Sequence, residues 1–432
     1  MRKRLAVVTV GCKANFADSA AIVRAAVLEG FEVVPHASFA DVVVINSCTV
    51  THRADRDSRS LARRSRRENP GATIVLSGCY ARVAPDARSR VPEVDYWLGS
   101  GNGEDGSGQT LSEILNRVRG GSAEPGTSLS EHAADLLLGH RRTFLKIQDG
   151  CDSACAYCVV PLARGKSRSL PEAKILEAAA ASEADGAREL VLTGIHIGRY
   201  GSDRGEPDAL SSLVRRLLGR LSEARIRLSS IEPKEMNERL LDLLEEHRRV
   251  CPHLHVPLQS GCDRTLSRMR RPYRAREYRE TVSAAAERIP GIQIGADVMA
   301  GFPGETREDF LETVRFLRDA PVHYLHVFPY SSRPGTESAG WKDDVPPAVK
   351  KERVGTLLSL DREKRERFAA AQAGRILEVL AERELPGGGR MSGRSENYLE
   401  VAFPAGGERL GKLCRVRVGA CRNGVLDGEV TG

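Results

Sequence analysis

Three short apolar runs in the first eighty residues each end two residues before a cysteine. The runs are "LAVVTV", "DVVVIN" and "TIVLS", and the cysteines are Cys12, Cys48 and Cys79. Continuous runs rich in β-branched residues are typical of strands that are buried on both faces of a parallel sheet. Helix-like stretches at 18–30 and 53–69 separate them. This alternation predicts an open parallel α/β domain over residues 1–100.

The position of these cysteines predicts that they lie close together. Parallel strands end at one edge of their sheet, and ligands of open α/β sheets bind outside that edge. We therefore expect Cys12, Cys48 and Cys79 to converge there as three metal-binding thiolates. Glycines precede Cys12 and Cys79. The alternative is three buried structural cysteines, which are common in protein cores.

The strand–helix alternation resumes after a segment with little strand character. The Gly- and Ser-rich stretch "GSGNGEDGSG" indicates a flexible linker, which we place at residues 101–140. From "TFLKI" onwards about six βα units follow, and they predict a partial (β/α)6 barrel over residues 141–371. Short β-like runs with glycine turns, such as "YLEVAFP" and "VLDGEV", predict a small all-β barrel over residues 372–432.

A second group of cysteines follows the first strand of the predicted barrel. Cys151, Cys155 and Cys158 have the spacing C-x3-C-x2-C within "CDSACAYC". Three thiolates from one tight loop are able to hold three irons of a 4Fe–4S cluster, which leaves the fourth iron open for a substrate. The alternative is a zinc knuckle that a distant histidine or cysteine completes. Cys251, Cys262, Cys414 and Cys421 show no ligand pattern, and we expect them to be packed thiols.

Composition sets broad limits on the class of protein. The 432 residues carry a formal net charge of +7, which favours a polyanionic partner only weakly in a chain of this length. No apolar run approaches the ~18 residues of a membrane helix, so we expect no membrane association. The basic and apolar N-terminus is better interpreted as a first strand than as an export signal. We therefore expect a cytoplasmic protein with reduced thiols.

The motifs together resemble a known family. Tyr157, directly before the last cysteine of "CDSACAYC", matches the radical S-adenosylmethionine (SAM) pattern. With both cysteine groups and a C-terminal module similar to a TRAM domain, the chain closely resembles the radical-SAM methylthiotransferases over nearly its full length. The resemblance implies two 4Fe–4S clusters, SAM, and insertion of a methylthio group at a C–H position. The six cysteines are then catalytic cluster ligands.

Three branches of that family differ in their substrate. "GCKANFADS" is similar to the branch that modifies C2 of N6-threonylcarbamoyladenosine next to the anticodon of tRNA, as are "LTGIHIG" and "LHVFPYSSRPGT". The alternatives are isopentenyl-adenosine in tRNA and an aspartate of a small-subunit ribosomal protein. A non-catalytic, zinc-bearing RNA-binding protein is a further hypothesis. Leu162, Lys166 and Leu170 depart from the usual family pattern. The resemblance also implies an electron donor such as flavodoxin or ferredoxin, and a sulfur donor.

Polar and glycine residues at the barrel strand ends are candidates for SAM contacts, because active-site residues gather there. The alternative for each is a tight turn or a turn cap. His52, His196, His253 and His255 are expected to be hydrogen-bonded structural residues rather than ligands. The cofactor candidates, besides the cysteines, are Tyr157, Thr193, Gly194, Ser229, Glu232, Gln259 and Gly301.

Basic residues near the barrel mouth and on the C-terminal module are candidates for RNA contacts. Arginines there would neutralise phosphates, and a tyrosine would stack on a base. The basic run at 63–67 is interpreted as a solvated helix face. The RNA-binding candidates are Arg164, Arg168, Arg271, Tyr273, Arg415 and Arg417.

Overall fold

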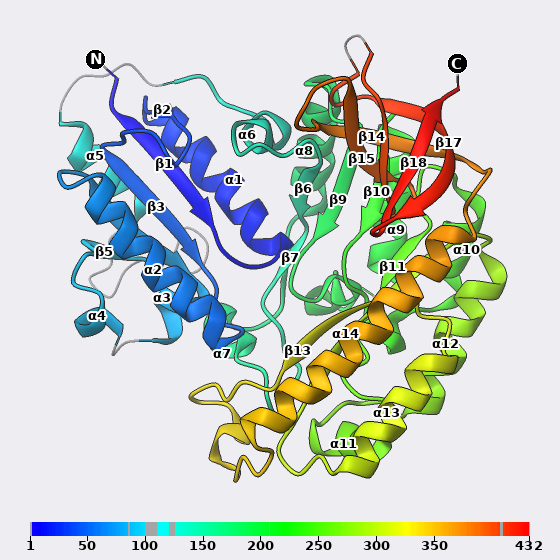
Figure 1. Ribbon diagram of the computed structural model, residues 1–432. Helices are drawn as coiled ribbons and strands as arrows, with labels where there is room; N and C mark the ends of the chain where they lie inside the picture. The colour runs from blue at the N-terminus through cyan, green and yellow to red at the C-terminus, as the bar shows by residue number, and fades with distance from the viewer. Residues whose placement is uncertain are drawn as a thin grey trace.

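The computed structural model describes residues 2–84, 87–99, 110–120, 126–206, 208–406 and 409–431. It contains an N-terminal parallel sheet, a central array of βα units and a C-terminal β-barrel, as Figure 1 shows from blue to red. This arrangement confirms the predicted fold class. Residues 100–109 and 121–125 of the region around and within the predicted linker, including most of the Gly- and Ser-rich stretch "GSGNGEDGSG", lie outside the described residues.

The N-terminal sheet has five parallel strands in the order β2-β1-β3-β4-β5. The central strand β3 is buried at all six positions, because its side chains alternate between two apolar clusters on opposite faces. This burial explains its unbroken apolar sequence. The elements are β1 (Arg4–Thr9), α1 (Lys13–Leu28), β2 (Glu32–Val33), β3 (Val42–Ser47), α2 (His52–Glu68), β4 (Thr73–Gly78), α3 (Cys79–Val83), α4 (Ala87–Arg90) and β5 (Tyr96–Trp97).

Two helices occupy the described part of the segment that was predicted as a linker. Helix α5 (Leu111–Arg119) begins with a capping box between Thr110 and Glu113 and packs Leu111, Ile114 and Leu115 against the N-terminal sheet. Helix α6 (Glu131–Leu137) packs against α1 through Ala134. Helix α5 therefore covers the N-terminal sheet, whereas α6 lies between α1 and the first barrel strand, β6 (Thr143–Lys146).

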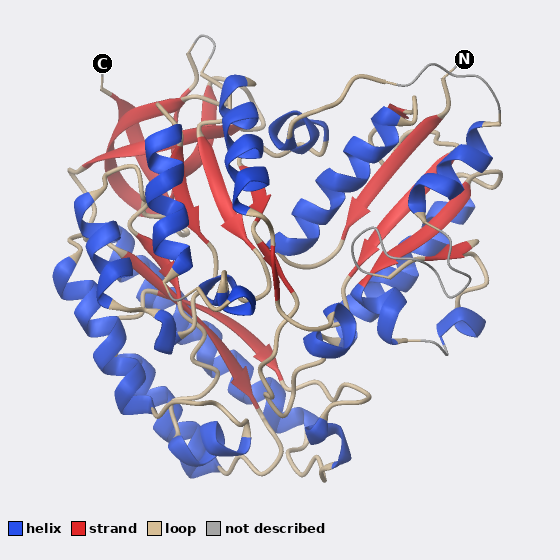
Figure 2. Cartoon of the chain, turned by 180° about the vertical axis from the view of Figure 1, so that it is seen from behind, coloured by secondary structure: helices blue, strands red, loops and turns tan. Residues whose placement is uncertain are grey.

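The central part is an open barrel of six parallel strands. Two three-stranded sheets, β6-β9-β10 and β11-β12-β13, are joined by a parallel bridge between Ser230 and His255. Figure 2 shows helices packed along these strands. The strands are β6 (Thr143–Lys146), β9 (Glu189–Thr193), β10 (Arg225–Leu228), β11 (His253–His255), β12 (Gln293–Ala300) and β13 (Tyr324–Pro329).

The remaining elements of the central part either flank this array or lie at its carboxyl edge. They are β7 (Gln148–Asp149), α7 (Val160–Arg164), β8 (Arg168–Ser169), α8 (Glu172–Ala184), α9 (Ala209–Arg220), α10 (Glu238–Glu246), α11 (Asp263–Arg268), α12 (Ala275–Arg288), α13 (Arg307–Asp319) and α14 (Pro347–Ala370). Outward-facing strand residues and these helices share the largest apolar cluster of the protein, which includes Leu190, Leu192 and Leu213.

The C-terminal strands form a closed barrel in the order β14-β15-β16-β18-β17. Its core is small and follows the two-residue alternation of strands, with Val416 and Val418 inside and Arg415 and Arg417 exposed. The strands are β14 (Ile376–Glu384), β15 (Arg390–Ser395), β16 (Glu400–Pro404), β17 (Leu413–Arg422) and β18 (Val425–Val430).

Two buried arginines of β10 attach the C-terminal barrel to the central one. Arg225 donates hydrogen bonds to the carbonyl oxygens of Glu378 (2.6 Å) and Arg394 (2.8 Å). Arg227 donates to the carbonyl oxygen of Glu396 (2.9 Å). Both guanidinium groups also pair with the fully buried carboxylate of Glu189. One buried carboxylate is therefore shared by both arginines, and Arg225 also lies 3.6 Å from the Glu378 carboxylate.

Candidate active site

Two glycine turns bring the separated cysteines together at the carboxyl edge of the N-terminal sheet. Gly11 has φ +123°, and a Cβ atom there would lie 2.8 Å from the Cβ atom of Cys48. Gly78 has φ +93°, and a Cβ atom there would lie 2.5 Å from the carbonyl oxygen of Ser47. Only glycine adopts such conformations without cost. The tight turns explain why glycine precedes Cys12 and Cys79.

The three thiols of this N-terminal triad influence each other electrostatically. Burial raises the pKa of Cys48 to about 12, and the neighbouring thiols of Cys12 and Cys79 add to the increase. Burial also raises the pKa of Cys79, and the guanidinium of Arg164 opposes that effect. Cys12 is exposed, whereas Cys48 and Cys79 are buried. The predicted convergence of these strand ends is therefore present in the fold.

The barrel triad lies in the loop between β7 and α7. Gly150 has φ +74°, and a Cβ atom there would overlap the carbonyl group of Lys166. The loop is held from two sides, because the amide of Ala156 donates to Met269 (3.1 Å) and its carbonyl accepts from Ser338 (2.8 Å). Burial raises the pKa of Cys158 to about 12, and the thiols of Cys155 and Cys151 add to this.

Three charged side chains contact sulfur atoms of the two triads. Arg271 Nη1 lies 3.4 Å from Cys155 Sγ, and Arg164 Nε lies 3.4 Å from Cys79 Sγ. His196 Nδ1 lies 3.5 Å from Cys151 Sγ. Such donors favour the thiolate form and a cluster with negative charge. Each triad therefore has a cationic partner that would stabilise the negative charge of an iron–sulfur cluster.

His196 is held between a thiol and a carboxylate. Its Nε2 atom forms an ion pair with Glu235 at 2.7 Å. Burial alone would lower its pKa, but the contacts with Cys151 and Glu235 raise the pKa to about 10. Sequence reasoning placed His196 only among hydrogen-bonded structural residues and missed this contact, because the sequence does not show which strand end faces the cysteine loop.

Three of the predicted RNA contacts do not fit the structure. Arg164 is 4% exposed and pairs with Asp18 and Asp149. Arg271 pairs with Glu232. The Tyr273 hydroxyl donates to the carbonyl oxygen of Pro257 (2.8 Å), and its ring is buried, so it is not available to stack on a base. All three side chains are satisfied inside the protein. Arg168, Arg415 and Arg417, in contrast, are exposed.

Beside a cavity of about 400 Å³ that is lined by Cys155, Glu232 and Arg271, two further neighbouring cavities open at the barrel triad. The first of these two, about 230 Å³, is lined by all three barrel cysteines. The second, about 290 Å³, is lined by Cys158 and by Val50 and Thr51, which closely follow Cys48 in the chain. The residues that line both cavities are Tyr157, Cys158, Val160, Gln259 and Asp297. The second cavity therefore extends from the barrel cysteines to the N-terminal domain, and we call it the interdomain chamber.

The predicted cofactor residues divide into two groups. Tyr157, Glu232 and Gln259 line the first cavity beside the cysteines. Among the described residues, Thr193, Gly194, Ser229 and Gly301 do not line either of the two cavities. Gly194 lies against Gln148, where a Cβ atom would be 2.6 Å from the backbone oxygen, so a packing reason for that glycine is present.

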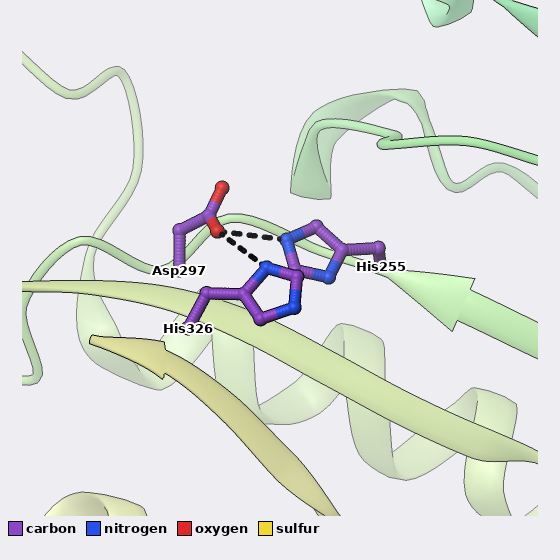
Figure 3. A group of neighbouring side chains, drawn as sticks. All are labelled: His255, Asp297 and His326. Carbon is purple, nitrogen blue, oxygen red and sulfur yellow. Dashed lines mark ion pairs between the residues drawn. The ribbon is translucent and has the colours of Figure 1, made fainter. Parts of the chain in front are cut away.

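A group of polar side chains that the sequence did not reveal lies on the inner face of the barrel. His255 Nε2 lies 3.0 Å from Asp297 Oδ1, and His326 Nδ1 lies 3.3 Å from the same oxygen (Figure 3). Burial would raise the pKa of Asp297, but the two histidines hold it well below its usual range. We call these residues the His–Asp–His group. Asp297 and His326 were missed because their proximity depends on the pairing of β12 with β13.

The spacing of the sulfur atoms distinguishes a site for a single metal ion from a site for an iron–sulfur cluster. A single zinc ion needs its ligand atoms within about 4–5 Å of one another. Among the described residues, only the His–Asp–His group has three ligand atoms within 4.8 Å of one another. The two cysteine triads are therefore more open than a single-ion site, as ligands of a larger cluster must be. Three thiolates with cationic neighbours fit a 4Fe–4S cluster with one open iron.

The fold and this loop define a class of enzyme. Residues 145–317 match the Radical SAM superfamily, and residues 4–99 match a family described as Uncharacterized protein family UPF0004. Proteins of the Radical SAM superfamily use a 4Fe–4S cluster and SAM. The central barrel with its cysteine loop is therefore a radical-SAM domain, joined to a second domain that has its own family.

Similar proteins of known name show which family within that superfamily the chain belongs to. The threonylcarbamoyladenosine tRNA methylthiotransferase MtaB of Aquifex aeolicus is 38% identical and covers 96% of this chain and 100% of its own length. The Bacillus subtilis protein of the same name is 34% identical, over 95% of this chain and 92% of its own. A tRNA-2-methylthio-N(6)-dimethylallyladenosine synthase of Syntrophobacter fumaroxidans is 33% identical, over 98% and 94%. The chain belongs to the radical-SAM methylthiotransferase family.

Solved structures confirm the fold alone. The radical SAM methyltransferase TsrM of Kitasatospora setae aligns with a TM-score of 0.55 at 17% identity, covering 78% of this chain and 77% of its own. None of the helices among the described residues combines the length and hydropathy needed to cross a membrane.

Proposed function

We propose that this protein adds a methylthio group to C2 of N6-threonylcarbamoyladenosine next to the anticodon of tRNA. The observation that carries the proposal is the interdomain chamber, which has a barrel cysteine at one wall and residues beside Cys48 at another. A methylthio transfer requires the sulfur-bearing site and the radical-generating site to reach one substrate atom. The names and full-length coverage of the relatives support the same substrate.

We assign Cys151, Cys155 and Cys158 to a SAM-binding 4Fe–4S cluster and Cys12, Cys48 and Cys79 to an auxiliary cluster. When bound, the first cluster and SAM supply a 5′-deoxyadenosyl radical, and the second supplies the sulfur site. The protein's own residues hold and insulate these groups. Arg271 and His196 donate to thiols of the first triad, and Arg164 donates to Cys79. Glu232 and Gln259 line the cavity beside the first triad and are placed to contact SAM.

We place the RNA-binding surface on exposed basic residues rather than on the buried ones. Arg168 begins the short strand β8, which pairs with β7 next to the barrel triad, and Arg415 and Arg417 project from the outer face of β17. Exposed arginines are able to neutralise phosphates without giving up an internal ion pair. A low-potential electron donor such as flavodoxin or ferredoxin, a sulfur donor and a cytoplasmic location complete the proposal.

The test begins with anaerobically purified protein. Two 4Fe–4S clusters predict about eight irons and equal sulfide per chain. Replacement of Cys155 by alanine should abolish reductive SAM cleavage. Replacement of Cys48 by alanine should leave about four irons, keep SAM cleavage and stop methylthio insertion. If the Cys48 variant keeps both activities, the auxiliary site is misassigned, and stoichiometric zinc in place of iron would support the zinc-bearing RNA-binding protein.

The substrate is tested separately by nucleoside analysis. Transfer RNA carrying threonylcarbamoyladenosine should gain a methylthio nucleoside when it is incubated with the enzyme, SAM, a reductant and sulfide. The dimethylallyl nucleoside is the second candidate, because a synthase for it is 33% identical to this chain. Methylthiolation of only the dimethylallyl tRNA would identify that branch. Methylthiolation of neither, with activity on the small-subunit ribosomal protein, would identify the third branch.

A further inference from the structure

The inner face of the barrel is open at the level of His326. Leu325 and Val327 pack with the outer helices, so Tyr324, His326 and Phe328 face inward. In a filled barrel the inward side chains are buried. The His326 side chain is 56% exposed, whereas Tyr324 is 2% exposed. His326 therefore faces open space inside the six-stranded array.

The orientation of His326 is fixed by its neighbours. Its Nδ1 atom pairs with Asp297, and its ring stacks on that of His255 with 4.7 Å between the centroids. His255 is held in turn by Asp297 and by the Tyr324 hydroxyl, 3.1 Å from its Nδ1 atom. An imidazole whose Nδ1 atom is bound to a carboxylate presents Nε2 on the other side of the ring. The described residues provide no partner for that nitrogen.

Cations approach the barrel interior beyond the Tyr324 ring, while Asp297 supplies a negative charge within the His–Asp–His group itself. The Tyr398 ring lies 6.4 Å from that of Tyr324, and Lys13 Nζ lies 5.5 Å from the Tyr398 ring. Lys13 forms no ion pair with any described carboxylate. Arg142 pairs with Glu382 (2.6 Å), and Arg227 shares Glu189 with Arg225. An unbalanced cation in a partly desolvated interior favours an anionic ligand.

His326 does not itself line the interdomain chamber, but its partner Asp297 does, and the chamber offers apolar surface against which a flat base is able to pack. Met299 and Phe328 line the interdomain chamber with apolar surface, and Asp297 lines it as well. Strand pairing sets Asp297 opposite His326 and Met299 opposite Phe328. In adenine, C2 and C6 flank N1, so a substituent on N6 points away from a reacting C2. A base whose C2 faces the cysteines is therefore able to direct its N6 substituent toward Asp297 and His326.

We propose that His326 is a specificity-determining residue that binds the carboxylate-bearing N6 substituent of the substrate adenosine. Asp297 and His255 act as positioning residues for it. The inference rests on the proposed function and identifies the part of the site that distinguishes this substrate from an adenosine with an apolar N6 group. A divalent cation in the His–Asp–His group is the competing explanation, since its three ligand atoms also lie within 4.8 Å of one another.

The experiment uses full-length, anaerobically reconstituted His326→Gln and the matched control His247→Gln, an exposed histidine after α10. Loss of one hydrogen bond to the N6 substituent should raise KM for threonylcarbamoyladenosine tRNA by about threefold to tenfold, with kcat much less affected. The selectivity for this tRNA over dimethylallyladenosine tRNA should fall by a similar factor. Iron content and tRNA-independent SAM cleavage should stay at wild-type values, and the control should match wild type throughout. Asp297→Asn should shift KM in the same direction.

Two results would overturn the inference while leaving the proposed function intact. One is wild-type selectivity in His326→Gln. The other is a stoichiometric divalent metal, beyond the cluster irons, that is present in the wild type and lost in the variant. If the wild-type enzyme does not modify threonylcarbamoyladenosine tRNA at all, the proposed function fails and this inference fails with it.

Discussion

Replacing Arg164 with methionine should loosen the contact between the N-terminal sheet and the barrel. The guanidinium lies 2.8 Å from Asp18 Oδ2 and 2.6 Å from Asn15 Oδ1 on α1, and 3.1 Å from Asp149 Oδ1 on β7. Methionine keeps much of the volume but leaves two largely buried carboxylates with less compensating charge. Removing one partner of a buried ion pair typically costs about 3–5 kcal/mol.

The magnitude for Arg164→Met should fall near the lower end of that range. Lys146 Nζ also contacts both carboxylates, at 2.5 Å from Asp18 and 3.0 Å from Asp149, so each keeps one cation. We expect a loss of about 3 kcal/mol in the free energy of opening this interface. Hydrogen exchange of the α1 and β7 amides reports that opening directly, without assuming two-state unfolding of the whole chain.

The matched control is Arg168→Met, an exposed arginine four residues further along the chain, at the start of β8. Arg168→Met should change the free energy of opening this interface by no more than about 0.5 kcal/mol. Equal amide protection of α1 in the two variants would refute the argument. A second readout is the reduction potential of the auxiliary cluster. Loss of the cation beside Cys79 should lower that potential, because the more negative reduced state loses its partner, and should leave the SAM cluster unchanged.

Two further variants test the glycine turn and a buried carboxyl group. Gly78→Ala should displace Cys79, because a Cβ atom at residue 78 would lie 2.5 Å from the Ser47 carbonyl oxygen. We expect about four irons per chain in place of about eight, with SAM cleavage retained. A wild-type iron content would contradict the argument from the glycine turn. The Asp135 carboxyl group is buried, and only its Oδ2 atom accepts a hydrogen bond, which the Phe144 amide donates. Burial raises the pKa of Asp135 from an ordinary 3.8 to about 8. Because the folded-state pKa is the higher one, the stability should fall as pH rises from about 4 to about 8. Asp135→Asn should reduce that loss by several kcal/mol at pH 8 and have little effect at pH 4, as measured by urea unfolding.

The arrangement of the N-terminal cysteines could be predicted because each one follows a strand. The length of a buried strand and its terminal glycine are local features, and the common edge follows from parallel topology. The helices at 111–119 and 131–137 were also accessible in principle. Thr110 and Glu113 form a capping box, and Leu111, Ile114 and Leu115 have helical spacing. The neighbouring Gly- and Ser-rich composition led to the prediction of a linker instead.

The residues that sequence reasoning placed wrongly depend on how domains dock and strands pair. A basic residue near a cysteine loop resembles a phosphate ligand, but Arg164 meets Asp18 and Cys79 only after the N-terminal sheet packs on the barrel. Asp297 and His326 become neighbours only through the register of β12 and β13. Such long-range pairings have no local signal in a single sequence.

The attachment of the C-terminal barrel through Arg225 and Arg227 affects which part of a bound RNA is able to reach the cysteine loop. Because these arginines bind main-chain carbonyl oxygens, the joint does not depend on which side chains occupy residues 394–396. These buried hydrogen bonds limit movement of the C-terminal barrel, and with it the outer face of β17, relative to the central barrel. An RNA bound on the outer face of β17 would therefore bring to the cysteine loop a nucleotide that lies at a set distance along the RNA. This distance would limit which nucleotide reaches the site, independently of any contact with its base.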